Sequence, residues 1–403
     1  MKYDFTSIID RKNKDASALD MLALEDPTGN TPKPAKEGFD EIPMWVADMH
    51  FATAPSVTKE LEERIRHPLY GYFMQKDEYY NAIINWQEKR NHVTGLQKEH
   101  IGYENGVHGC VATVVEKFTN PGDRVLMYSP VYVGFKYDVD AIGRISVYSE
   151  LKKDENGIYR MDFDDMERKI RENNIHLTIF CSPHNPTGRV WERWELERAL
   201  KIFEDNDVYV VSDEIWADLT YSGHQHIPTQ MVNDWARNHT VAVYSPSKNF
   251  NLAGLGSSYH IIYNDFLRAR MGHTHYNEQN VLSYHALIGA YSEEGAEWTD
   301  ELREVLHTNC EYVANYLNSI DGIEVTVPQG TYMLFADLTK YCEKTGRNIL
   351  DVLQAGWDVG VAWQNGRDFN GPCHIRLNMA SPLSRMQEAC RRMEKYVFTK
   401  QNL

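Results

Sequence analysis

The fold is decided by residues 177–214, which read LTIFCSPHNPTGRVWERWELERALKIFEDNDVYVVSDE. Short strands are predicted at 177–181 and 208–211, because both runs are apolar and rich in β-branched and aromatic residues. A helix is predicted between them, over 192–204. A strand, a helix and a second strand in this order form a βαβ unit, in which the two strands run parallel.

The same alternation continues on both sides of this unit. Further elements are predicted as strands at 124–128, 240–244 and 259–263, and as helices at 56–67, 78–91, 107–118 and 162–172. This alternation is typical of an α/β fold with a mostly parallel sheet that helices cover on both faces. Beyond residue 291 the regular alternation of strands and helices ends, and a long helix followed by shorter elements is predicted. We therefore expect a large domain at 46–290 and a smaller α+β domain at 291–403, which the N-terminal arm, 1–45, completes.

Composition narrows the range of partners. The 403 residues include 42 Lys and Arg against 58 Asp and Glu, a formal charge of −16, so the chain lacks the basic field that attracts nucleic acid or anionic lipid. The six cysteines are scattered, and no C-x-x-C pair, secretory signal or run of about 20 apolar residues is visible in the sequence. We expect a cytoplasmic protein that binds neither nucleic acid nor membranes.

Polar side chains follow three of the predicted strands. Asn185 follows the strand at 177–181, Asp213 follows the strand at 208–211, and Lys248 follows the strand at 240–244, between Ser245 and Ser247. The carboxyl ends of parallel strands meet at one edge of a sheet, where α/β proteins bind their ligands. The same residue types also cap strands and fill solvated turns, so spacing alone leaves that alternative open.

Pyridoxal phosphate requires this set of groups: a lysine for the Schiff base, an acid for the pyridine nitrogen and small donors for the phosphate. Lys248 would carry the aldehyde, Asp213 would bind the pyridinium and Asn185 would donate to the phenolic oxygen. The phosphate and ring contacts would come from the hydroxyls of Ser245 and Ser247, the backbone N–H groups at Val107 and His108 where a helix begins, and a stacked Tyr132.

Three motifs resemble the fold-type I pyridoxal phosphate enzymes, the aminotransferase class I/II superfamily. They are SPHNPTGRV at 182–190, VVSDEIWADL at 210–219 and YSPSKNFNLAGL at 244–255. Four further segments are MWVADMHF at 44–51, HPLYGY at 67–72, PQGTYM at 328–333 and HIRLNMASP at 374–382. With them the chain resembles, above all, the MalY/PatB-type cystathionine β-lyases, also called C–S lyases, over nearly its whole length.

The resemblance implies an aspartate aminotransferase-like architecture, with a seven-stranded-type sheet in the large domain. It implies that Lys248 is the Schiff-base lysine and the acid/base shuttle. It also implies that Arg376 and Ala47 bind the substrate, and that Arg376 binds the α-carboxylate of the substrate. It also implies that Tyr72 reaches the cofactor phosphate of the neighbouring subunit, so that the functional unit is a homodimer with shared sites.

The activity implied is α,β-elimination from L-cystathionine or a related cysteine S-conjugate, which yields a thiol (homocysteine from cystathionine), pyruvate and ammonia. An aminotransferase of the same fold is the alternative, because both enzymes use every residue named above. A regulatory protein that keeps the fold without catalysis ranks lower, because the chain is acidic and no DNA-binding extension is visible in the sequence.

The chain departs from the family pattern at four positions. Trp216 stands where class I aminotransferases commonly have Tyr, and no Arg stands near Gly256. Asn249 and His50 stand where the lyases usually have Thr and Asp. These changes bear on substrate preference more than on cofactor binding.

No metal site is expected. The histidine pairs His224/His226 and His273/His275 have a spacing of two residues and no third ligand nearby in the sequence.

Overall fold

The computed structural model describes residues 1–24, 31–272 and 278–399. The chain forms two compact units. The smaller unit comprises Met1–Ala52, Pro186–Gly188 and Glu301–Leu403, and the larger comprises Thr53–Asn185 and Arg189–Asp300. The long helix α11 (Glu293–Asn318) runs from the larger unit into the smaller one.

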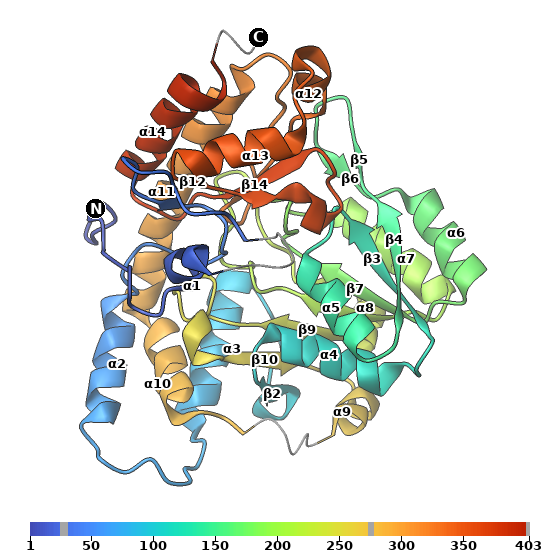
Figure 1. The fold of residues 1–403 in the computed structure, drawn as a ribbon. Coiled ribbons are helices and arrows are strands. Elements are labelled where there is room, and N and C mark those ends of the chain that lie inside the picture. Colours follow the sequence, from blue (N-terminus) through green and yellow to red (C-terminus); the bar gives the residue numbers. More distant parts are fainter. Residues whose placement is uncertain (25–30, 273–277, 400–403) are drawn as a thin grey trace. The chain divides into compact units, whose positions relative to one another are not determined.

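A seven-stranded sheet forms the centre of the larger unit (Figure 1). Its strands, in spatial order, are β2 (Ile101–Glu104), β10 (Ser258–Ile261), β9 (Thr240–Tyr244), β8 (Tyr209–Asp213), β7 (Leu177–Cys181), β3 (Arg124–Ser129) and β4 (Ile145–Glu150). Only β10 pairs antiparallel with its neighbours; the pairs among β9, β8, β7, β3 and β4 are parallel. The predicted α/β class and mostly parallel sheet are confirmed.

Both faces of this sheet are buried under helices, as the apolar sequences of its central strands require. Alternate residues of β3 show the two faces: Val125 and Met127 pack under α4 (Val107–Phe118), α5 (Val133–Ala141) and α9 (Asp265–Met271). Leu126 and Tyr128 pack on the opposite face, under α6 (Phe163–Asn173), α7 (Arg193–Asp205) and α8 (Asp234–His239). The side-chain period of two residues therefore divides the core into two layers.

Three further helices complete the larger unit: α2 (Pro55–Ile65), α3 (Asp77–Asn91) and α10 (Val281–Ala290). Helix α2 packs closely on α10, because Gly289 has no side chain; a Cβ there would lie 2.6 Å from the Ser56 carbonyl oxygen. A small hairpin, β5 (Lys152–Lys153) and β6 (Tyr159–Arg160), follows β4. The exposed segment that carries Tyr72 lies between α2 and α3.

The smaller unit has its own antiparallel sheet, in the order β11 (Met333–Asp337), β14 (His374–Asn378) and β13 (Gln364–Asn365). A parallel pair joins the N-terminal arm, through β1 (Ile42–Pro43), to β12 (Val361–Ala362). Its helices are α1 (Ser17–Asp20), α12 (Thr339–Thr345), α13 (Ile349–Asp358) and α14 (Leu383–Arg392). The N-terminal arm is thus part of this unit.

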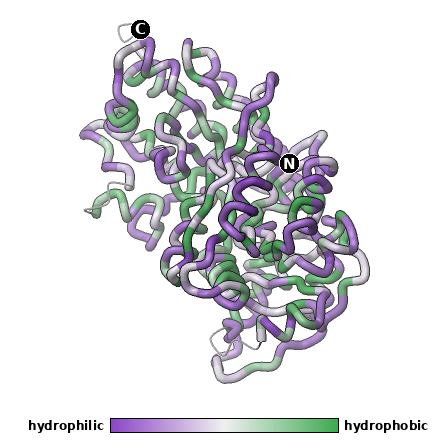
Figure 2. Tube along the Cα trace, turned by 90° about the vertical axis from the view of Figure 1, so that its right-hand side faces the viewer, coloured by the Kyte–Doolittle hydropathy of each residue, from purple (hydrophilic) through white to green (hydrophobic). Residues whose placement is uncertain are grey.

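Hydrophilic and hydrophobic stretches are interspersed along the described trace (Figure 2). Within residues 1–24, 31–272 and 278–399, no helix is both long enough and apolar enough to cross a membrane.

Candidate functional site

The ends of β7, β8 and β9 bring the predicted acid and amine together. Cys181 at the end of β7 pairs with Asp213 at the end of β8, and Asp213 pairs with Val243 of β9. Asn185 is buried in the loop that follows β7. Lys248 lies close enough to Asp213 for its positive charge to lower the pKa of the carboxyl. An amine and a carboxyl therefore lie near each other at one edge of the sheet.

Asp213 is deeply buried, and burial raises the pKa of its carboxyl to about 6. A hydrogen bond from the Ile215 backbone N–H, 3.1 Å long, and the charges of His108 and Lys248 oppose this rise. A carboxyl that is excluded from water needs a cationic partner to be stably ionised. Its environment is therefore suited to a positively charged ligand group.

Lys248 lies in a tight turn after β9. The turn is closed by hydrogen bonds from Phe250 N–H to the Pro246 carbonyl (2.9 Å) and from Leu252 N–H to the Ser247 carbonyl (3.0 Å). The Lys248 ammonium lies 5.8 Å from the centre of the Trp216 ring. The turn thus fixes the backbone at Lys248, and the amine lies beside an aromatic face.

The two serines beside Lys248 have different environments. The Ser245 hydroxyl donates to the Ser257 carbonyl and accepts a 3.1 Å hydrogen bond from the Ser247 N–H. Ser245 is buried, whereas Ser247 is partly exposed. In this structure Ser245 stabilises the turn, and Ser247 is the serine whose side chain is more accessible.

Helix α4 begins at Val107, after a glycine whose conformation few other residues adopt. Gly106 has φ +84° and, having no side chain, leaves the first N–H groups of α4 without a side-chain cap. Nearby, the Tyr132 hydroxyl lies 3.0 Å from Nε2 of His108. The start of α4, at Val107 and His108, therefore offers N–H donors for an anion.

A buried polar network lies next to Asp213. Glu214 accepts hydrogen bonds from the ring of His226 (2.7 Å), the Tyr244 hydroxyl (2.5 Å), the Ser212 hydroxyl (2.9 Å) and the Thr229 N–H (3.0 Å). Although burial disfavours its charge, His226 and these hydrogen bonds hold the pKa of Glu214 below its ordinary value. Sequence reasoning missed this network, whose members come from three separate segments.

Arg376 lies on β14 of the smaller unit and is only 3% exposed. Its Nη2 donates to the Trp45 carbonyl (2.9 Å) and to Gln364 Oε1 (2.6 Å), and its guanidinium carbon lies 4.2 Å from the centre of the Phe369 ring. These contacts fix the orientation of the guanidinium. In the same unit, the carbonyl of Ala47 accepts a 3.0 Å hydrogen bond from the Tyr332 hydroxyl.

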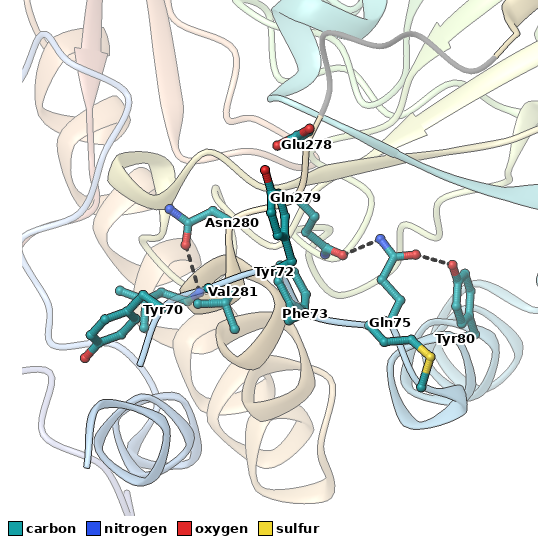
Figure 3. A pocket seen from close by; sticks show the side chains of 12 residues that line it. Tyr70, Tyr72, Phe73, Gln75, Tyr80, Glu278, Gln279, Asn280 and Val281 are labelled. Carbon is teal, nitrogen blue, oxygen red and sulfur yellow. Dashed lines mark hydrogen bonds between the residues drawn. The ribbon is translucent and has the colours of Figure 1, made fainter. Parts of the chain in front are cut away.

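Tyr72 is fully exposed, in a hollow of about 920 Å³ on the larger unit. Figure 3 shows the side chains that line this hollow, which come from the segment before α3, from α3 and from the start of α10. A hydrogen bond from Gln75 to Gln279, 2.6 Å long, joins the two sides, and Tyr80 donates to Gln75 (Figure 3). Leu69 and Met74 of the same segment are also exposed. Exposed apolar side chains grouped in this way are typical of a protein interface.

Three of the four departures from the family pattern have defined surroundings in the structure. Trp216 is buried beside Lys248. The Asn249 side chain donates a 3.0 Å hydrogen bond to the Thr299 hydroxyl. Burial, reinforced by the Arg11 charge, lowers the pKa of His50 to about 4, and its Nδ1 lies 3.3 Å from the Arg11 guanidinium.

The predicted histidine pairs do not form a described metal cluster. His226 is bonded to Glu214, and His273 and His275 lie outside the described residues. Within the part of the chain that the structure describes, one set of metal-type side chains gathers, with ligand atoms within 4.8 Å of one another: Glu104, Cys110 and His260. Two members of this set, His260 and Glu104, are joined by a 2.9 Å hydrogen bond at His260 Nδ1.

The sheet, the lysine-bearing turn and the uncapped helix together define the class of protein. The chain belongs to the family of aminotransferases of class I and II, whose model matches residues 42–393. The family predicted from the sequence is confirmed.

Individual relatives narrow this class. The chain is 32% identical to cystathionine β-lyase PatB of Bacillus subtilis over 88% of this chain and 92% of the relative. It is 30% identical to protein MalY of Escherichia coli over 96% of both chains. Among solved structures, the PLP-bound C–S lyase of Staphylococcus hominis superposes with a TM-score of 0.86 at 32% identity, covering 97% of this chain and 98% of the lyase.

Proposed function

We propose that the protein is a pyridoxal 5'-phosphate-dependent carbon–sulfur β-lyase that acts on L-cystathionine or a related cysteine S-conjugate. The observation that carries this proposal is the placement of the Lys248 amine near the buried Asp213 carboxyl at neighbouring strand ends. The names of two similar proteins, a cystathionine β-lyase and a C–S lyase, support the reaction type.

The donor set of the larger unit fits pyridoxal phosphate. Lys248 supplies a primary amine for the aldehyde, and Asp213 supplies a carboxyl in surroundings that favour a cationic partner. Asn185 supplies an amide N–H for the phenolic oxygen. The start of α4 at Val107 and His108, together with Ser247, supplies donors for the phosphate, and Tyr132 supplies an aromatic face.

When bound, pyridoxal phosphate supplies an electron sink for the charge left at Cα when its proton is removed. Lys248 is the base that removes this proton. Asp213 accepts the N–H of the pyridine nitrogen and keeps that nitrogen protonated. The Cβ–S bond breaks with its electron pair on sulfur, which takes up a proton. With one water consumed, the products are a thiol, pyruvate and ammonium.

We propose that Arg376 binds the α-carboxylate of the substrate. A guanidinium fork holds a carboxylate through two parallel hydrogen bonds, and Trp45 and Gln364 orient this fork in advance. Ala47, whose carbonyl is fixed by Tyr332, is proposed to contact the same substrate. On this view the larger unit is the cofactor domain and the smaller unit is the substrate-carboxylate domain.

An aminotransferase remains the second candidate, because the family includes such enzymes and the same residues serve both reactions. The two are separated by products. We expect the purified protein, loaded with pyridoxal phosphate, to release pyruvate and free thiol from L-cystathionine in equal amounts. Accumulation of the pyridoxamine form without pyruvate would contradict the lyase proposal and favour transamination.

We further propose that the enzyme is a homodimer of the cytoplasm. The exposed Tyr72 and its apolar neighbours support an interface, and the six free cysteines are compatible with a reducing compartment. In such a dimer Tyr72 would serve the phosphate of the partner subunit.

Shared sites make a specific prediction for mixed dimers. Tyr72→Ala alone is expected to weaken cofactor binding roughly tenfold or more, since a hydrogen bond to a charged group is lost. A dimer that combines one Tyr72→Ala subunit with one Lys248→Ala subunit should regain about half of the wild-type activity, because one of its two sites has both residues intact. Activity is measured at limiting cofactor after differently tagged subunits are co-purified.

The exposed Tyr312, replaced by alanine in the same mixing scheme, is the matched control. A mixed dimer that stays inactive while each parent dimer remains folded would show that Tyr72 acts within its own subunit, contrary to the proposal.

A further inference from the structure

Three side chains of the larger unit form a hydrogen-bonded chain that the proposed function does not use. His108 Nδ1 lies 2.9 Å from Asp138 Oδ2, and His108 Nε2 lies 3.0 Å from the Tyr132 hydroxyl. His108 stands in the first turn of α4, Tyr132 immediately precedes α5, and Asp138 lies on α5. His108 is therefore the middle of the chain: it links α4 to Asp138 of α5 and also contacts the tyrosine that is proposed to stack on the cofactor.

Gly134 leaves the space that this chain of hydrogen bonds occupies. A Cβ at Gly134 would lie 2.6 Å from the Tyr132 ring and 2.8 Å from His108 Nε2, so a larger residue would displace the imidazole. Gly134 and Asp138 are one turn apart on α5 and face the same neighbour. The Tyr132 ring also meets Phe135 edge to face, with centres 5.4 Å apart. The tyrosine is thus positioned by contacts with both His108 and Phe135.

The charges that face His108 come from three directions. The hydrogen bond to Asp138 on α5 raises the pKa of the imidazole, and the negative charge of Asp213 on β8 raises it further. Burial and the positive charge of Lys248 lower it, but the net effect is a pKa above the ordinary 6.5. The Tyr132 hydroxyl also contacts the ring, at Nε2.

The two charge states of His108 require opposite hydrogen-bond directions. A charged imidazolium donates through both nitrogens, so the Tyr132 oxygen accepts and its own proton points elsewhere. A neutral ring that donates to Asp138 from Nδ1 has only a lone pair at Nε2, so Tyr132 must donate to it.

We propose that His108 is a positioning residue whose charge decides whether Tyr132 presents a hydroxyl donor or only an oxygen acceptor to a bound phosphate-bearing pyridine ligand. Asp138 holds the ring in the tautomer that makes this choice. The inference rests on the proposed function, because it assumes that such a ligand lies against Tyr132. A donor favours the anionic oxygens of the ligand, so the charged state of His108 binds it more tightly.

The test uses the apo-protein and pyridoxamine 5'-phosphate, which has no aldehyde to react with Lys248. Calorimetry gives its Kd between pH 6 and 9 for the wild type and three variants. Titration of the ligand itself is common to all four proteins and cancels in the comparison. In the wild type we expect roughly tenfold weaker binding as the pH rises through the titration of His108, above 6.5.

Each variant tests one part of the inference. His108→Gln should remove the excess pH dependence, and Asp138→Asn should move its midpoint to lower pH. Tyr132→Phe should remove it as well; if Tyr132→Phe keeps the wild-type profile, His108 acts by charge alone and the proposed route through the hydroxyl is wrong. An unchanged midpoint in Asp138→Asn would also overturn the inference. If the wild type binds no pyridoxamine phosphate at any pH, the proposed function itself fails.

Discussion

Lys248→Ala is expected to lower pyruvate formation from L-cystathionine by at least about 10³-fold, the scale of a lost acid/base group. The same variant should lose the visible absorption that lysine-bound pyridoxal phosphate gives. Both effects follow from the position of the amine in the closed turn after β9, near Asp213. Steady-state kinetics and an absorption spectrum of the purified protein measure them.

Two further variants control this experiment. Lys248→Arg keeps a positive charge but has no amine that can act as a base at neutral pH, so it should be as inactive as the alanine variant. Lys201→Ala removes an exposed lysine of α7 that pairs with Asp205, and it should keep full activity and colour. A visible band retained by Lys248→Ala would refute the assignment of this lysine.

Sequence reasoning was most effective for the central strands. The predicted strands at 177–181 and 240–244 match β7 and β9 residue for residue, because central strands buried on both faces are uninterrupted apolar runs. Parallel pairing brings the carboxyl ends of such strands together, so strand order and spacing were sufficient to predict that Asp213 and Lys248 lie near each other.

The edges of the sheet were not predicted. β4 is an edge strand whose sequence, ISVYSE, is polar at alternate positions and mostly only partly buried, and β2 contains a glycine. Helix α5 was missed as well, because its sequence, VGFKYDVDA, includes β-branched residues and a glycine that disfavour a helix. Tertiary packing, not local propensity, stabilises these elements.

The side-chain networks depend on that same packing. Nothing in the sequence brings His108 to Asp138, since their contact requires α4 and α5 to lie side by side with Gly134 between them. Likewise nothing in the sequence places His226 against Glu214, where it is buried. Contacts between side chains far apart in the sequence are set by the register of packed elements, which periodicity does not encode.

Asp213→Asn is expected to lower activity and to raise the stability of the apo-protein. Activity should fall by about 10²–10³-fold, the usual loss when one fixed electrostatic partner of a reacting system is removed. Stability should change in the opposite direction, because the apo-protein buries a carboxyl without the cationic ligand that it is placed to bind. Function at this position thus comes at the expense of stability.

The stability that Asp213→Asn gains should depend on pH, and the direction of this dependence follows from the pKa of Asp213. Burial raises the pKa of Asp213 from 3.8 to about 6, so the folded apo-protein binds a proton that the unfolded chain has released, and wild-type stability falls as the pH rises from about 4 to 6. This rise in the pKa of Asp213 corresponds to about 3 kcal/mol in the free energy of unfolding. That value is the upper limit of the stability that Asp213→Asn gains over the wild type at pH 7.5. Thermal unfolding is measured at pH 4.5 and 7.5, at one protein concentration. The Tm of Asp213→Asn should exceed that of the wild type by a large amount only at pH 7.5.

The effect of the cofactor on stability and a surface variant serve as controls for Asp213→Asn. Pyridoxal phosphate should stabilise the wild type more than Asp213→Asn, because only the carboxylate gains a cationic partner on binding. Asp164→Asn, a change at an almost fully exposed side chain, should leave Tm and activity unchanged at both pH values. A variant of Asp213 that is less stable than the wild type at pH 7.5 without cofactor would show that the buried carboxyl supports the apo fold, and the proposed conflict between function and stability would not exist.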